Sequence, residues 1–246
     1  MTAPALSVTV AALSEAGRRE CNEDAFGYWE GNGSLVAVLC DGAGGHGGGQ
    51  AASRLAVTRV LDAFAPRPEV SPSALRWLVL GANDAVLAQQ VAGTPTADMR
   101  TTIVVLLVDL HTGAALWAHA GDSRLYRWHQ GRLLGHTRDQ TLERRLRDAG
   151  LCANDAATGQ LTSALGSADG LDLEMLPAPH QLAEGDALLL CSDGLWSALD
   201  EATMAASVGG CPDVRAWIDR LGVAVLRADH GDQDNYSALA VWCGAR

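Results

Sequence analysis

Residues 35–42, LVAVLCDG, form an apolar strand that runs directly into Asp41 and Gly42. The pattern recurs at residues 188–194, LLLCSDG, which deliver Asp193, and an acidic segment with Asp234 directly precedes the apolar residues 236–243. A carboxylate at the end of a buried strand is unfavourable unless it is paired or binds a cation. One Asp-Gly pair by itself is typical of a turn. Three such junctions in one chain favour a common site for a hard divalent cation, which prefers oxygen ligands.

Around these junctions, apolar runs and turns predict antiparallel strands with helices set between blocks of them. The expected strands are 6–13, 35–40, 102–109, 114–120, 123–129, 171–176, 187–191 and 236–243. The expected helices are 50–64, one that starts at Pro72 after the cap Ser71, 140–149, and one from about 212. The strands at 102–129 follow one another closely, which predicts a meander. The pattern predicts an α+β fold and one domain over residues 1–246.

The composition excludes several classes of protein. All 18 basic residues are Arg, so Schiff-base chemistry and a P-loop lysine are excluded. The net charge of −11 argues against nucleic acid or an anionic membrane as a partner. No basic leader begins the chain and no apolar stretch is long enough to span a membrane, so we expect a cytoplasmic protein. No Cys pair has zinc-site spacing, and Cys40, Cys191 and Cys243 end apolar runs as buried thiols do.

Seven motifs in order carry a resemblance to a known family. They are RRECNEDAFG, LCDGAGGHGGGQAAS, MRTTIVVL, AHAGDSRLYRW, LTSALG, LLLCSDGLW and GDQDNYSALAV. With these motifs the chain resembles the metal-dependent type 2C Ser/Thr protein phosphatases, in their short bacterial form. The resemblance implies a central antiparallel β-sandwich flanked by helix pairs, with a two-metal site at one end.

The resemblance also implies a role for each matching residue. Asp41 would bridge two Mn²⁺ or Mg²⁺ ions, with the Gly42 carbonyl on one ion and Asp193 and Asp234 on the other. A water between the ions, acidified by them, would attack phosphorus in line.

Four further residues receive roles in the same way. Glu23 and Asp24 would hold metal-bound waters, and Asp98 is a candidate ligand for a third ion, with a loop carboxylate as the alternative. Arg19, five residues before Asp24, would bind the substrate phosphate, because a guanidinium fork matches two phosphate oxygens.

Several positions depart from the family pattern. Arg100 stands where glycine is usual, so we expect a different local turn. Ala43 follows the Asp-Gly where eukaryotic relatives often carry His, and we expect His46 to be structural. Gln140 replaces the histidine of the family's T-x-D-H segment, which leads into the flap over the site in relatives. We expect Asp122 and Arg124 of the GDSR motif to form a structural corner clamp.

The resulting expectation is a monomeric protein phosphatase that acts on phosphoserine and phosphothreonine proteins and opposes a bacterial Ser/Thr kinase. Two alternatives stay open: a pseudophosphatase that binds a partner without catalysis, and a hydrolase of small phosphoesters. The presence of Asp41, Asp193 and Asp234 favours an enzyme, because degraded members of such families lose metal aspartates.

Overall fold

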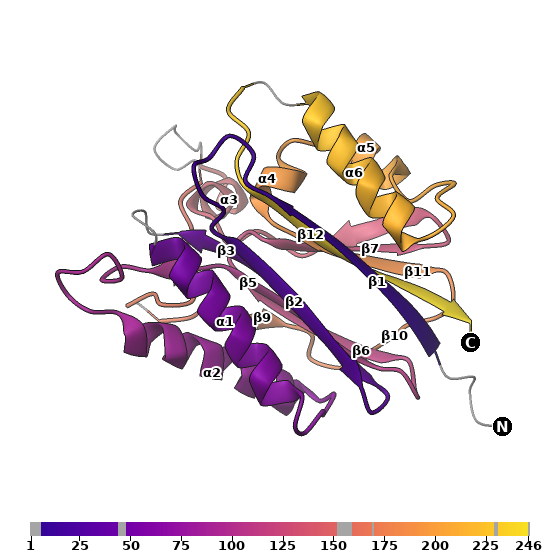
Figure 1. The fold of residues 1–246 in the computed structure, drawn as a ribbon, viewed down its shortest axis with the longest axis horizontal. Helices are drawn as coiled ribbons and strands as arrows, with labels where there is room; N and C mark the ends of the chain where they lie inside the picture. Colours follow the sequence, from indigo (N-terminus) through magenta and orange to yellow (C-terminus); the bar gives the residue numbers. More distant parts are fainter. Residues whose placement is uncertain (1–5, 44–47, 152–158, 169, 229–230, 246) are drawn as a thin grey trace.

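Two antiparallel sheets pack face to face at the centre of the molecule (Figure 1). The computed structural model describes residues 6–43, 48–151, 159–168, 170–228 and 231–245. The first sheet has the order β1-β12-β11-β7-β8. Its strands are β1 (Leu6–Glu15), β12 (Tyr236–Ala245), β11 (Asp186–Cys191), β7 (Arg124–His129) and β8 (Arg132–His136). The second sheet has the order β10-β6-β5-β3-β2, with β4 paired to β3 and β9 to β6. Its strands are β10 (His180–Gln181), β6 (Ala114–Ala120), β5 (Ile103–Asp109), β3 (Ser34–Ala43), β2 (Asp24–Gly31), β4 (Arg100–Thr101) and β9 (Glu174–Met175).

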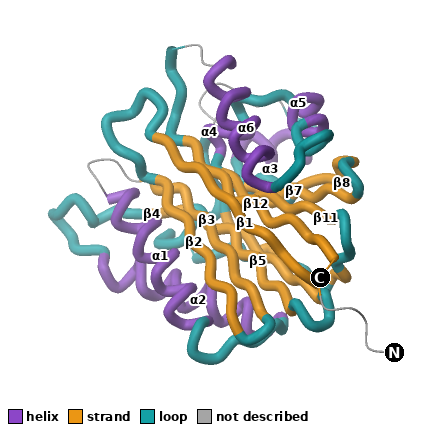
Figure 2. The backbone as a smooth tube through the Cα atoms, turned by 45° about the vertical axis from the view of Figure 1, so that its right-hand side comes forward, coloured by secondary structure: helices purple, strands orange, loops and turns teal. Residues whose placement is uncertain are grey.

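Helices cover both outer faces of this sandwich (Figure 2). The second sheet is covered by α1 (Gly48–Phe64) and α2 (Pro72–Gln89), and the first sheet by α5 (Glu201–Ala206) and α6 (Val214–Ala228). Two shorter helices, α3 (Leu142–Asp148) and α4 (Asp193–Trp196), follow strands of the first sheet. The expected helix–sheet–sheet–helix architecture is confirmed, and Ser71 caps α2 by accepting the Ala74 N–H at 3.1 Å.

The continuous apolar runs follow from burial on both faces of a sheet. In β3, Val36 and Val38 pack against the helices, whereas Leu35 and Leu39 pack against the other sheet. Successive side chains of a strand point to opposite faces, so both sets must be apolar. None of the helices in the described part of the chain has the length and apolar character that a membrane span needs.

The structure corrects two expectations about the strands. The meander is wrong at its third strand, because β7 leaves β5 and β6 and joins the first sheet. The chain crosses between the sheets at Gly121, whose φ of +105° favours glycine. The strand expected at 171–176 is only Glu174–Met175.

Strand β2 was not expected from the sequence. It forms a hairpin with β3 through Asn32 and Gly33, which have φ of 52° and 73°. Asn-Gly between two strands is a strong hairpin signal, so Asn32-Gly33 is the feature of the sequence that predicts this hairpin. The hairpin matters because β2 begins at Asp24, beside the end of β3.

Candidate active site

A cavity of about 750 Å³ lies at the end of the sandwich where β3 and β11 end and β2 and β12 begin. Its lining brings together six of the predicted site residues: Arg19, Glu23, Asp41, Gly42, Asp193 and Asp234. Asp98 is exposed and is not among the lining residues. Because segments from positions 19 to 234 meet here, the cavity is a product of the tertiary fold.

Hydrogen bonds to the main chain fix the position of Asp41. Its N–H donates to the Thr102 hydroxyl, and its carbonyl accepts from the Thr101 hydroxyl, each at 2.9 Å. Arg100, the departure from the family pattern, lies exposed in β4, where it pairs with Ala43. The substituted position therefore forms a short regular strand, and Thr101 and Thr102 hold Asp41.

Asp41 and Asp193 lie close enough for their carboxyl groups to hydrogen bond to one another. Burial, followed by the charges of neighbouring aspartates, raises the pKa of Asp41 well above its ordinary value. Burial also raises the pKa of Asp193. Two carboxylates in contact disfavour each other's ionisation, so a bound cation would favour the charged form of both.

Asp24 is a buried carboxyl group that joins the two sheets. One oxygen, Oδ2, accepts a hydrogen bond at 2.7 Å from the hydroxyl of Ser192, which directly follows β11 of the first sheet. The other, Oδ1, is buried and has no hydrogen-bond partner among the described residues. Burial raises the pKa of Asp24 to about 6. The unpartnered oxygen belongs to a residue that lies directly opposite Asp41 in the β2–β3 register.

Asp122 is a cavity residue that the sequence reasoning assigned to a different role. Burial, and then the charge of Asp193, raises its pKa to about 7. The expected clamp with Arg124 is wrong: Arg124 makes a two-pronged ion pair with Asp139, both bonds at 2.7 Å. Arg124 also lies 3.5 Å over the ring of Trp196, whose indole N–H donates to the Asp122 carbonyl. The sequence does contain a feature that indicates Asp122 as a site residue: the apolar strand β6 leads into Gly-Asp, as the other apolar strands lead into Asp41 and Asp193.

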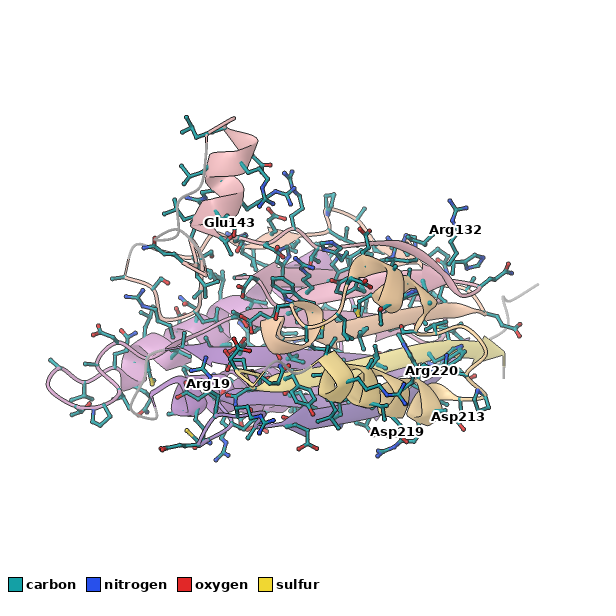
Figure 3. The ribbon with its side chains drawn as sticks, turned by 90° about the horizontal axis from the view of Figure 1, so that it is seen from above. Arg19, Arg132, Glu143, Asp213, Asp219 and Arg220 are labelled. Carbon is teal, nitrogen blue, oxygen red and sulfur yellow. The ribbon has the colours of Figure 1, made fainter. Side chains whose placement is uncertain are left out.

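Arg19 extends from the loop between β1 and β2 (Figure 3). Its guanidinium donates to Asp234 Oδ2 at 2.7 Å. The two side chains are 61% and 40% exposed, and an ion pair this open contributes little to stability. Arg19 can therefore exchange Asp234 for an incoming anion at small cost.

Asn235 ties this loop to β12 and was not predicted. It is 7% exposed, and its Oδ1 accepts the Glu23 N–H at 2.8 Å. Its Nδ2 donates to the carbonyls of Ala16 and Cys21, at 2.8 and 3.0 Å. One amide thus positions the segment that carries Arg19 and Glu23 beside Asp234.

The glycines of the Asp-Gly junctions permit close backbone approach. A side chain at Gly42 would collide with the Gly49 backbone and would lie 2.7 Å from the Glu23 carbonyl. The start of α1 thereby packs directly on the segment that follows Asp41. His46 and the rest of 44–47 lie outside the described residues.

Gln140, the other departure, is buried behind the cavity. Its Oε1 accepts the Gly121 N–H at 2.9 Å, and its Nε2 donates to the Asp172 carbonyl at 3.0 Å. Gln140 therefore supports the corner next to Asp122.

The donor set suits a hard cation, although the described carboxylates currently contact protein partners. Across residues 6–43, 48–151, 159–168, 170–228 and 231–245, no three His, Cys, Asp or Glu side chains are arranged to hold a metal ion as they stand. Asp41 instead contacts Asp193, and Asp234 contacts Arg19. The predicted donors are all oxygen atoms, and Asp24 Oδ1 lacks a partner in the described structure. Buried carboxyls with raised pKa values are groups that a divalent cation would stabilise in their charged form.

Comparisons with known proteins place the whole chain among protein phosphatases. The family described as "Protein phosphatase 2C" matches residues 14–233. The chain is 29% identical over 238 residues to serine/threonine protein phosphatase PstP of Mycobacterium tuberculosis, covering 95% of this chain but 45% of that protein. It is 27% identical over 235 residues to serine/threonine phosphatase stp of Listeria welshimeri, covering 91% and 90%. A structure of the PstP catalytic domain in complex with two manganese ions superposes with a TM-score of 0.80 at 29% identity, covering 97% and 99%.

Proposed function

Because the chain belongs to the protein phosphatase 2C family, we propose that it hydrolyses phosphoserine and phosphothreonine in proteins with the help of two divalent cations, Mn²⁺ or Mg²⁺. We take residues 1–246 as a single phosphatase domain. Its substrates would be phosphoproteins made by a cognate bacterial Ser/Thr kinase. The observation that carries the proposal is the convergence of Asp41, Asp193 and Asp234 on one cavity that also contains Arg19.

We assign the carboxylates two roles, direct metal ligands and residues that bind metal-bound water. Asp41, Asp193, Asp234 and the Gly42 carbonyl would hold the two ions, and Glu23 and Asp24 would act through water. When bound, such cations neutralise the carboxylates and the phosphoryl oxygens and lower the pKa of water. For a third ion, Asp122 is the better candidate than Asp98, because Asp122 lines the cavity and the exposed Asp98 does not.

Arg19 would orient the substrate. A guanidinium offers two parallel donors to two phosphoryl oxygens, and its exposed contact with Asp234 is weak enough to exchange. Arg19 would thus contribute to substrate binding and to alignment of phosphorus in the cavity.

Covalent catalysis by a buried cysteine is disfavoured. Burial raises the pKa of the Cys40 and Cys191 thiols, so neither forms a thiolate readily near neutral pH. No histidine is among the described residues that line the cavity. The exposed Cys21 does line the cavity, but without a histidine among those residues it has no imidazole base to activate it, so we propose water as the nucleophile.

The test is phosphate release from a phosphothreonine peptide by protein that has been treated with EDTA and then supplied with Mn²⁺ or Mg²⁺. We expect no turnover in EDTA and recovery with Mn²⁺. Asp193→Asn and Asp234→Asn should each lose most activity at low Mn²⁺ while circular dichroism shows a folded protein. Full activity in excess EDTA would refute the metal mechanism.

Parallel assays separate the alternatives. A pseudophosphatase would bind phosphopeptide but release no phosphate under any metal condition. A hydrolase of small phosphoesters would turn over free phosphoserine or p-nitrophenyl phosphate better than phosphopeptide.

A further inference from the structure

We propose that a groove on the open edge of the sandwich, outside the catalytic cavity, binds an extended segment of the phosphoprotein substrate. The groove lies between β8 and the segment around β9, and we call it the edge groove. Its floor and walls are formed by Trp117, Leu125, Leu134, His136 and Met175. The proposal rests on the proposed function, because it names how that enzyme would select its substrates.

The edge groove is continuous and separate from the cavity. Two hollows of about 420 and 190 Å³ share Trp117, His136 and Thr137, so they form one depression. None of the described residues that line it also lines the catalytic cavity.

Strand edges form both walls of the edge groove. Strand β8 is the outermost strand of the first sheet, beside β7 (Figure 2). Strand β9 pairs with β6 at the margin of the second sheet. An unpaired strand edge presents a row of N–H and C=O groups that an extended peptide can extend by strand addition. This geometry favours an extended polypeptide over a compact ligand.

The chemistry of the edge groove indicates which side chains it would accept. Leu134 is 53% exposed on β8, and the buried Trp117 beside it gives the groove an apolar floor. The Arg127 guanidinium lies 5.0 Å over the Trp117 ring and 2.8 Å from His180 Nε2. Within the described residues Arg127 has no carboxylate partner at ion-pair distance. An apolar side chain next to an acidic one therefore complements this surface.

The other charged groups around the edge groove already have partners. Arg138 pairs with Asp148 at 2.8 Å, and Glu174 lies 3.8 Å from His119 Nε2. Asp186, whose charge acts on Arg127, accepts a hydrogen bond from His129. Arg127 is therefore the cation of this lining that has no carboxylate partner among the described residues, whereas Arg138 would first have to release Asp148.

The edge groove lies within reach of the cavity. Trp117 precedes Asp122 by five residues along β6 and its corner. At about 3.3 Å per residue the two positions are at most about 17 Å apart, which about five residues of extended peptide span. We therefore expect an apolar–acidic pair five or six residues from the phosphoresidue to increase kcat/KM.

The experiment compares two phosphothreonine peptides in Mn²⁺. One has three flanking residues on each side; the other has eight, with Leu-Glu placed five and six residues from phosphothreonine on both sides. For wild-type protein we expect the longer peptide to have at least a fivefold higher kcat/KM, mainly through a lower KM. Leu134→Asp and Arg127→Gln should abolish this preference and leave turnover of p-nitrophenyl phosphate unchanged. Leu226→Asp, at a 66% exposed leucine on α6, is the matched control and should retain the preference.

The results that differ from these expectations contradict the proposal in distinguishable ways. No length preference in the wild type, or equal losses on both peptides and p-nitrophenyl phosphate, would overturn the edge groove. If Leu134→Asp changes only the sedimentation of the protein, the groove is a self-association surface and the proposal fails. Fluorescence anisotropy of the labelled, unphosphorylated long peptide measures binding without catalysis. An inactive protein that binds this peptide through Leu134 would refute the phosphatase and support the groove.

Discussion

Asn235→Ala should weaken both the stability of the protein and its recognition of phosphate. The substitution removes three hydrogen bonds, to the Glu23 N–H and to the Ala16 and Cys21 carbonyls. At a site only 7% exposed, water replaces these partners poorly. At about 1 kcal/mol for each lost bond, we expect the free energy of unfolding to fall by about 3 kcal/mol. Because the freed loop carries Arg19, KM for a phosphopeptide should rise more than kcat falls.

Asn235→Asp sharpens this prediction because aspartate has nearly the same shape. It retains an acceptor for the Glu23 N–H, loses both donors and adds a negative charge beside Asp234. We expect it to be at least as harmful as alanine.

The assay is urea unfolding in EDTA together with kcat and KM at saturating Mn²⁺. Asn83→Ala is the matched control, since Asn83 makes one such bond, to the Gly166 N–H at 3.0 Å, away from the cavity. It should lower stability by about 1 kcal/mol and leave KM unchanged. If Asn235→Ala is no more destabilising than Asn83→Ala, or leaves KM unchanged, the positioning role is refuted.

Three further perturbations test the site. Arg19→Ala should lower kcat/KM on a phosphopeptide about 10- to 100-fold. Arg18 lies outside the cavity lining, so Arg18→Ala should lower kcat/KM far less. Equal losses would indicate only a general effect of positive charge. Gly42→Ala should lower the urea midpoint, because the new methyl group would collide with the start of α1. Gly81→Ala should raise the midpoint, because open space surrounds the new methyl group. The reverse order of the two midpoints would contradict the packing. The pKa of Asp24 is about 6 in the folded protein and 3.8 in the unfolded chain, so the folded state binds this proton more tightly. The free energy of unfolding of the metal-free protein should therefore fall by about 3 kcal/mol as the pH rises from about 4 through 6. Thermal melts in EDTA and in Mn²⁺ check this, and an identical pH dependence in both would exclude a cation effect on the carboxylates.

Much of the architecture was predictable because local sequence patterns indicate it. Residues 35–40 are apolar at every position, as a strand covered on both faces requires, and Ser71-Pro72 is a favoured helix start that α2 confirms. The predicted strands that lead to Asp41 and Asp193 are present, and the cavity contains both aspartates. The roles of those aspartates as metal ligands stay predictions.

What the sequence by itself determined is therefore most of the long strands and helices, without β2, and the positions of Asp41 and Asp193 at the ends of apolar runs. Only the tertiary structure decided which strands share a sheet and which side chains meet. Strand β7 joins the first sheet although it follows β6 by a short corner, and this crossing brings Asp122 beside Asp193. Asn235 reaches Glu23 across 212 positions of the chain. The physical reason is that hydrophobic periodicity and turn propensity are local properties of the sequence, whereas pairing between distant carboxylates and amides depends on how complete sheets stack.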